Sequence, residues 1–155
     1  PEPDPEPEEP EDPHAAIFEA ARAGHHSQAA AMAAAWEQAA LRAHGPDSAE
    51  AIHWVEVRAD LARLAGEPDR SCSLWMVVAS TRLMAGQRPE QTEVANAVDR
   101  AHHCWHLIDD PGTARELGLE LAPLRQRVPG GKPGAVEDVQ GRLNLLVGEA
   151  AQRRP

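Results

Sequence analysis

The densest group of residues able to do chemistry is the segment AHHCWH, residues 101–106. His102 and His106 are four residues apart, and on an α-helix this spacing places two imidazoles on one face, where they can clamp a metal ion. His103 and His106 are three apart and can instead share a polar groove. A zinc site needs three or four ligands with supporting groups, and the chain has no CxxC or HExxH motif,. Groove histidines are therefore the prediction, and a metal site is the alternative.

The sequence shows no pattern of catalytic residues comparable to this histidine cluster. The sequence contains no nucleophile elbow, phosphate-binding loop, Gly-rich dinucleotide turn or carboxylate pair with a supporting base,. We therefore predict that the chain is not an enzyme and needs no cofactor. Cys72 and Cys104 are predicted to be buried free thiols of a cytoplasmic protein, although antiparallel helices on either side of residue 88 would bring them to the same height.

A polar helix face that returns forty-three residues later is the strongest pattern in the sequence. Between Asp47 and Gly66, the spacing i, i+3, i+7, i+10 of one helix face holds His53, Glu56, Asp60 and Arg63,. The matching positions of the second copy hold Asn96, Asp99, His103 and His106. The apolar positions between them repeat as well, which indicates an internal repeat. In this register His102 takes the core-side place of Ala59, so one metal ion would not collect all three histidines of the cluster.

Charge and composition exclude several classes of protein. Seven of the 25 acidic residues lie in residues 1–13, which leaves 18 acidic against 15 basic residues in the remainder, a net charge of −3. The basic residues are scattered, so the stripe that nucleic acid requires is not predicted. No apolar run approaches the length of a membrane span, so no membrane contact is predicted either,.

Helices are the predicted secondary structure throughout the folded part. Ala-rich, Tyr-free usage with a single Phe favours helices over a sheet,. Residues 1–13 alternate Pro with acids, which predicts an extended acidic linker. Breaks at Gly and Pro divide residues 14–149 into about seven helices, and residues 150–155 are predicted to be a frayed end.

Capping residues predict where several of these helices begin. Asp47 is the predicted N-cap of the third helix, with Glu50 completing a capping box. Pro68 and Asp110-Pro111 are predicted to open the fourth and sixth helices, and Arg88-Pro89-Glu90 the fifth. The last helix is predicted from Ala135 to about Gly148. All four tryptophans are predicted to lie in the core: Trp36, Trp54, Trp75 and Trp105.

Three helix pairs share a hinge pattern. The hinges at Gly24, Gly66 and Asp109 are each followed five residues later by a small residue, namely Ala29, Ser71 and Ala114. This pattern resembles tetratricopeptide repeats, in which the hinge glycine ends helix A and the small residue lets helix B approach closely. Trp75 also stands where that family has a large apolar residue, whereas Ala33 and Gly118 occupy the other two such positions. The repeat spacing of 42 and 43 residues resembles the longer-helix variants of the family. The resemblance implies an all-α, right-handed α-solenoid of antiparallel helix pairs, with other helical-hairpin arrays as the alternative.

The repeated polar face is the predicted binding site. Equivalent positions on stacked A helices form adjacent rows, where one partner can touch several repeats. Most of its side chains are His, Asn or Asp, which make defined hydrogen bonds at low entropy cost. The resemblance implies a bacterial interaction module that binds a peptide, a partner domain or another copy of itself through the helix A groove. The alternative is a helical sensor domain that binds a metal or small ligand at the His-rich face.

Overall fold

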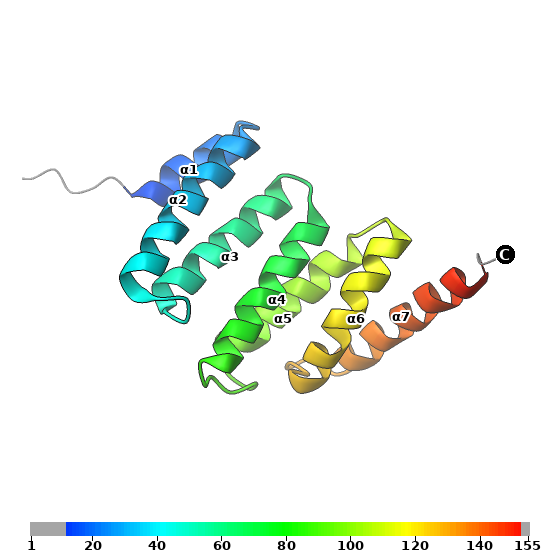
Figure 1. Cartoon of the computed structure of the whole chain (residues 1–155). Helices are drawn as coiled ribbons and strands as arrows, with labels where there is room; N and C mark the ends of the chain where they lie inside the picture. The colour runs from blue at the N-terminus through cyan, green and yellow to red at the C-terminus, as the bar shows by residue number, and fades with distance from the viewer. Residues whose placement is uncertain (1–11, 153–155) are drawn as a thin grey trace, which may run out of the picture.

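The protein is all-α over residues 12–152, the part of the chain that the computed structural model describes (Figure 1). The seven helices there are α1 (Pro13–Arg22), α2 (His26–His44), α3 (Ala49–Leu64), α4 (Pro68–Met84), α5 (Thr92–His106), α6 (Pro111–Arg127) and α7 (Ala135–Gln152). No strand occurs within these residues. The predicted all-α fold with about seven helices is confirmed.

Side-chain caps fix three of the helix starts, those of α1, α3 and α6. The Asp110 carboxylate accepts the backbone N–H of Thr113 at 2.8 Å, so Asp110 is the N-cap of α6, as predicted,. For α3 the prediction of Asp47 was wrong by one residue. Ser48 is the cap there, because its hydroxyl oxygen accepts the N–H of Ala51 at 3.1 Å.

The ends of α5 and α7 also differ from the prediction. The chain does not become helical at residues 88–90, because the Gln91 side chain accepts the Arg88 N–H at 2.6 Å and holds this stretch as a turn. The α5 helix therefore begins at Thr92. At the other end α7 continues past Gly148 to Gln152.

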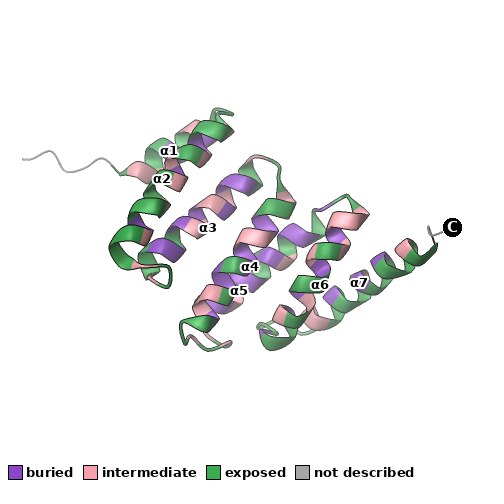
Figure 2. Ribbon diagram, in the orientation of Figure 1, coloured by how far each residue is buried: buried purple, intermediate pink, exposed green. Residues whose placement is uncertain are grey.

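The helices follow one another along the molecule in chain order. Each helix packs on the next, and in addition α1 contacts α3 and α4 contacts α6. Figure 1 shows the result, an elongated arrangement with α1 at one end and α7 at the other. The buried faces lie where neighbouring helices meet (Figure 2). A site built by side chains from several helices must therefore lie across helices that are near neighbours in this order.

Two apolar cores lie along the molecule and share α3. The N-terminal core joins α1 and α2 to one side of α3, where Trp54 and Leu61 are buried. The larger core joins the other side of α3, through Ile52 and Ala59, to the helices that follow it. Because α3 is buried on both sides, neither core is complete without it.

The three small residues after the hinges are all fully buried. Ala29, Ser71 and Ala114 have 0% exposure, and the Ser71 hydroxyl donates to the Ala59 carbonyl oxygen at 2.8 Å. Small side chains at these places allow close helix approach.

Gly118 shows why the large residue of the pattern is missing from the last pair. The ring of Trp105 already fills this space, since a Cβ on Gly118 would lie 2.9 Å from Trp105 Cζ2. Close packing of an aromatic ring against α6 thus requires a residue without a side chain.

The tryptophans and cysteines follow the prediction with one exception. Trp54, Trp75 and Trp105 are buried, but Trp36 is 44% exposed and stacks on Trp54 with ring centroids 5.8 Å apart. Trp36 was therefore wrongly assigned to the core. Cys72 and Cys104 are buried free thiols, as predicted.

Two predicted segments at the chain ends are only partly described. Residues 1–11 of the predicted linker lie outside the described residues, and its last residue, Pro13, opens α1 with Asp12 as N-cap. Residues 150–152 of the predicted frayed end belong to α7, and residues 153–155 lie outside the described part. Each helix between residues 12 and 152 is too short or too polar to span a lipid bilayer.

Candidate functional site

The repeated polar face divides into several local groups. Four of its eight residues line one groove between α3 and α5: Asp60, Arg63, Asp99 and His103. The other four lie apart from it. His53 contacts His14, and Glu56 pairs with Arg82 of α4 at 2.6 Å. His106 meets Asp138 of α7, and Asn96 is exposed on α5.

The groove between α3 and α5, which we call the central groove, has a polar rim and an apolar floor. Its volume is about 430 Å³. Trp75 of α4 and Cys104 of α5 lie at its base and are buried. The Arg100 guanidinium lies over the Trp75 ring, 4.8 Å from the centroid, and forms part of the rim. The indole therefore holds a cation at the edge of the groove through a cation–π contact.

Asp60 is the electrostatically unusual residue of the central groove. Burial raises the pKa of its carboxyl above the ordinary value, while the charges of Arg63 and Arg100 act in the opposite direction. Among the ion pairs between residues 12 and 152, none includes Asp60. A half-buried carboxylate without a direct ion-pair partner is costly, and groups with such shifted pKa values concentrate at binding and catalytic sites.

A second groove, the flanking groove, adjoins the central one and shares Asp99 and His103 with it. It has a volume of about 380 Å³ and extends to the loop before α7 and to Asp138. Figure 1 shows this loop beside the end of α6. The two grooves together span α3, α5 and the start of α7.

Arg125 of α6 supports the wall of the flanking groove. It is 1% exposed, and its Nη2 pairs with Asp99 Oδ1 at 2.8 Å. Its Nε donates to the Val128 carbonyl oxygen at 3.1 Å, which attaches the loop after α6 to this helix. At Gly130, where φ is +77°, an added Cβ would collide with the Arg125 guanidinium. A glycine is needed there both for the backbone angle and for the space.

Two histidines of α5 and an aspartate of α7 form a compact trio. Asp138 Oδ2 lies 2.6 Å from His102 Nε2 and 2.5 Å from His106 Nε2. The hydrogen bond from His106 is the main cause that lowers the pKa of the Asp138 carboxyl. Burial lowers the pKa of His102, although the Asp138 carboxylate opposes this effect. The trio therefore holds an ionised carboxylate between two imidazoles.

Sequence reasoning found the spacing of His102 and His106 but not their partner. Asp138 is one of two adjacent acidic residues in the first turn of α7, with Glu137, and nothing in the local pattern distinguishes it. The 43-residue register predicted that His102 and His106 lie on different sides of the helix, and this is wrong in effect, because both contact one carboxylate. His103, which the register placed with His106, lines both grooves and shares the flanking one with His102 and Asp138, but it is not a member of the trio.

A histidine pair at the N-terminal end was not predicted. His14 Nε2 lies 2.6 Å from His53 Nε2, and its Nδ1 lies 2.7 Å from Asp12 Oδ1. The His14 ring also stacks on Trp54 with centroids 4.8 Å apart. The hydrogen bonds with His14 lower the pKa of Asp12. This pair connects α1 to α3, and His53 therefore does not line the central groove.

A smaller pocket lies on another part of the surface, between α2 and the ends of α3 and α4. It has a volume of about 170 Å³ and is lined by His26, Arg58 and several alanines. Arg58 also pairs with Glu37 at 2.7 Å. None of the eight residues of the repeated polar face lines this pocket.

Comparison with known proteins adds no assignment. No family model matches the chain, and no curated protein matches it in sequence. The function must therefore be inferred from the geometry of the grooves and clusters.

Proposed function

We propose that the chain is an interaction module that binds a peptide in the central and flanking grooves. One observation carries the proposal. Asp60 and His103 are equivalent positions of the 43-residue repeat, and they line the same groove from α3 and α5. Equivalent side chains that meet on one surface are what stacked A helices produce.

The same proposal includes the architecture. We propose a tetratricopeptide-like solenoid in which α1, α3, α5 and α7 are the A helices and α2, α4 and α6 the B helices. Contacts of α1 with α3 and of α4 with α6 support it, because they join helices of the same kind across neighbouring pairs. The complete burial of Ala29, Ser71 and Ala114 supports it as well.

The shape and chemistry of the grooves favour a peptide over a compact small molecule. Two adjoining grooves make an elongated surface, which suits an extended chain,. The half-buried Asp60 carboxylate is an acceptor for a backbone N–H or a basic side chain, and Trp75 with Cys104 offers an apolar floor for a neighbouring residue,. The preferred ligand is thus a peptide with a basic residue next to an apolar one. Such a peptide can belong to another protein of the cytoplasm or to a second copy of this chain.

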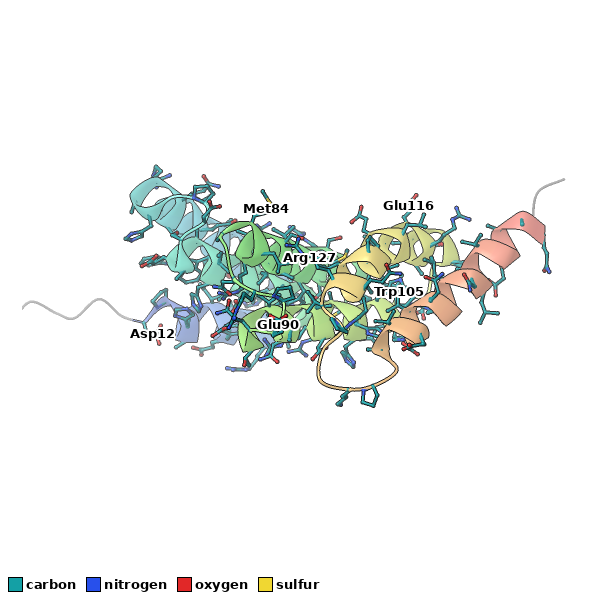
Figure 3. All side chains as sticks on the ribbon, turned by 90° about the horizontal axis from the view of Figure 1, so that it is seen from below. Asp12, Met84, Glu90, Trp105, Glu116 and Arg127 are labelled. Atoms are coloured by element: carbon teal, nitrogen blue, oxygen red, sulfur yellow. The ribbon has the colours of Figure 1, made fainter. Side chains whose placement is uncertain are left out.

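The test is selection of peptides from a displayed random library, followed by affinity measurements on the enriched sequences. Asp60→Ala combined with His103→Ala should weaken binding at least tenfold, about 1.4 kcal/mol. The matched control is Met84→Ala combined with Glu116→Ala, which leaves the grooves intact. Figure 3 shows Met84 and Glu116 on the edge that α4 and α6 form. Equal affinity of both double variants, with unchanged circular dichroism, would assign binding to another surface.

A further inference from the structure

The trio of His102, His106 and Asp138 is a second candidate site at the edge of the flanking groove, which His102 and Asp138 also line, and its chemistry differs from that of peptide binding. We propose that it binds a divalent transition-metal ion of the zinc type. All three ligand atoms, two imidazole Nε2 and one carboxylate oxygen, lie within 4.8 Å of one another. Among the residues that the structure describes, this is the one group of three or more potential ligands so arranged.

The donor set fits zinc chemistry. Zinc takes imidazole nitrogens and carboxylate oxygens at about 2.0–2.2 Å, so neighbouring ligands in a tetrahedral site are about 3.3 Å apart. Asp138 Oδ2 lies 2.6 and 2.5 Å from the two nitrogens, so a shift of less than about 1 Å at each side chain would admit the ion,. Without metal, a proton on each imidazole Nε2 forms the hydrogen bond to the Asp138 carboxylate. The ion would replace those protons.

The two side chains from α5 stand on a rigid base. Trp105, between them in sequence, is fully buried and donates its indole N–H to the Ala114 carbonyl oxygen at 2.7 Å. Its ring centroid lies 6.2 Å from that of His102 and 5.3 Å from that of His106. The ring restricts where the two imidazoles can go, and such restriction lowers the entropy cost of binding.

Arg142 fixes the third ligand relative to the first two. It lies one turn beyond Asp138 on α7, and its guanidinium lies 4.4 Å from the Trp105 ring centroid. Its two terminal nitrogens donate to the carbonyl oxygens of Trp105 and Ile108, at 2.5 and 2.9 Å. These contacts join α7 to the C-terminal end of α5. Asp138 is therefore held opposite the histidines by contacts that do not involve a metal.

One neighbouring group limits the strength of the site. Arg125 Nη1 lies 3.5 Å from His102 Nδ1, and its positive charge disfavours a cation on the same ring. The charge is balanced by Asp99, whose Oδ1 is 2.8 Å from Arg125 Nη2. With three protein ligands and half-exposed Asp138, the metal would keep a position for water,. The site thus suits an exchangeable ion more than a permanently bound one.

The test is titration of the chelator-treated full chain with zinc chloride by calorimetry. Wild type should bind one equivalent, and zinc should raise its thermal midpoint because the ion joins α5 to α7. Asp138→Asn and His106→Ala should each lower the affinity by about tenfold or more. Asp138→Asn preserves the shape of the side chain, and the circular dichroism spectrum of the metal-free variant checks that the fold is intact.

A matched control distinguishes the trio from the other histidines. His53→Ala breaks the pair with His14 and should bind zinc as wild type does. The proposal is overturned if wild type shows no saturable binding. It is equally overturned if Asp138→Asn and His106→Ala bind zinc like wild type.

Discussion

Replacing Gly118 with alanine should destabilise the protein, although the same change stabilises most helices. At an open helix position, Gly→Ala gains roughly 1 kcal/mol because it reduces the freedom of the unfolded backbone. At Gly118 the new methyl group would lie 2.9 Å from Trp105 Cζ2 and 3.0 Å from Leu143 Cδ1. Both neighbours are buried, and Trp105 is fixed by its hydrogen bond to Ala114.

The size of the effect follows from two opposed terms. Overpacking a closed core site costs typically about 1–3 kcal/mol, and the gain in helix propensity offsets roughly 1 kcal/mol of this. The expected result for Gly118→Ala is a net loss of up to about 2 kcal/mol of unfolding free energy. Gly141 supplies the control, because it lies in α7 with nothing within 4 Å of an added Cβ. Gly141→Ala should stabilise by about 0.5–1 kcal/mol.

The assay is urea unfolding followed by circular dichroism, with both variants and wild type measured together. The difference between the two variants isolates the overpacking term, about 1–3 kcal/mol, because the propensity term is common to both. Equal stability of Gly118→Ala and Gly141→Ala would refute the close packing of Trp105 on α6. It would also remove the rigid base argued for the His102 and His106 side chains.

Four further outcomes are expected. Trp75→Ala should cost about 3–5 kcal/mol in urea unfolding, and Trp36→Ala roughly half as much or less, since these side chains are 2% and 44% exposed; equal losses would contradict the packing,. Burial raises the pKa of the Cys72 thiol to about 12, so the unfolding free energy should fall as pH rises from about 9 towards 12, by up to about 1.4 kcal/mol per unit, and a flat profile would refute this,. Burial raises the pKa of Asp60, so the stability that its protonated form contributes is lost as pH rises above the ordinary pKa of 3.8,. Asp60→Asn should therefore raise the thermal midpoint at pH 7 but not at pH 3. A lower midpoint at pH 7 would contradict the burial of this carboxyl. Because the pKa of Asp138 is lowered, its contribution to the folding stability is present above pH 3.8 and is lost as pH falls below that value,. Asp138→Asn should therefore make the thermal midpoint fall less steeply on the acid side of its pH profile. An unchanged acid side would show that the two histidine contacts add nothing to stability.

Helix positions could be predicted because glycine, proline and capping residues act locally. Asp110 caps α6 by reaching the N–H three residues away, and this signal lies wholly within a short segment,. Where two adjacent residues can both serve as the N-cap, the sequence alone does not show which of them caps the helix. Asp47 and Ser48 are both good N-caps, and the choice of Ser48 depends on how the loop after Gly45 turns; its hydroxyl also donates to the Gly45 carbonyl oxygen.

The candidate site was predictable only as far as the repeat extends. The 43-residue period relates α3 to α5, and it correctly brought Asp60 and His103 to one surface. It carries no information about helices outside the period. Arg82 of α4 therefore could not be predicted as the partner of Glu56, nor Asp138 of α7 as the partner of His106.

The exposure of Trp36 was missed for a related reason. Periodicity places a residue on a face of its helix but does not say how far the neighbouring helices extend over that face. In α2 the buried side chains are alanines, namely Ala29, Ala33 and Ala40. The large indole is left at the margin, stacked on Trp54.

The shared position of α3 between the two cores has a consequence for how the molecule comes apart. The N-terminal core draws mainly on alanines from α2, so it buries little apolar area, and each Å² contributes about 25 cal/mol,. We expect α1 and α2 to open before the rest, leaving α3 folded on α4 through Ile52 and Ala59,. In native-state hydrogen exchange the amides of α1 and α2 should thus lose protection first, while α4 and α5 retain it until the whole chain unfolds. The protein would then behave as two cooperative units joined by one common helix.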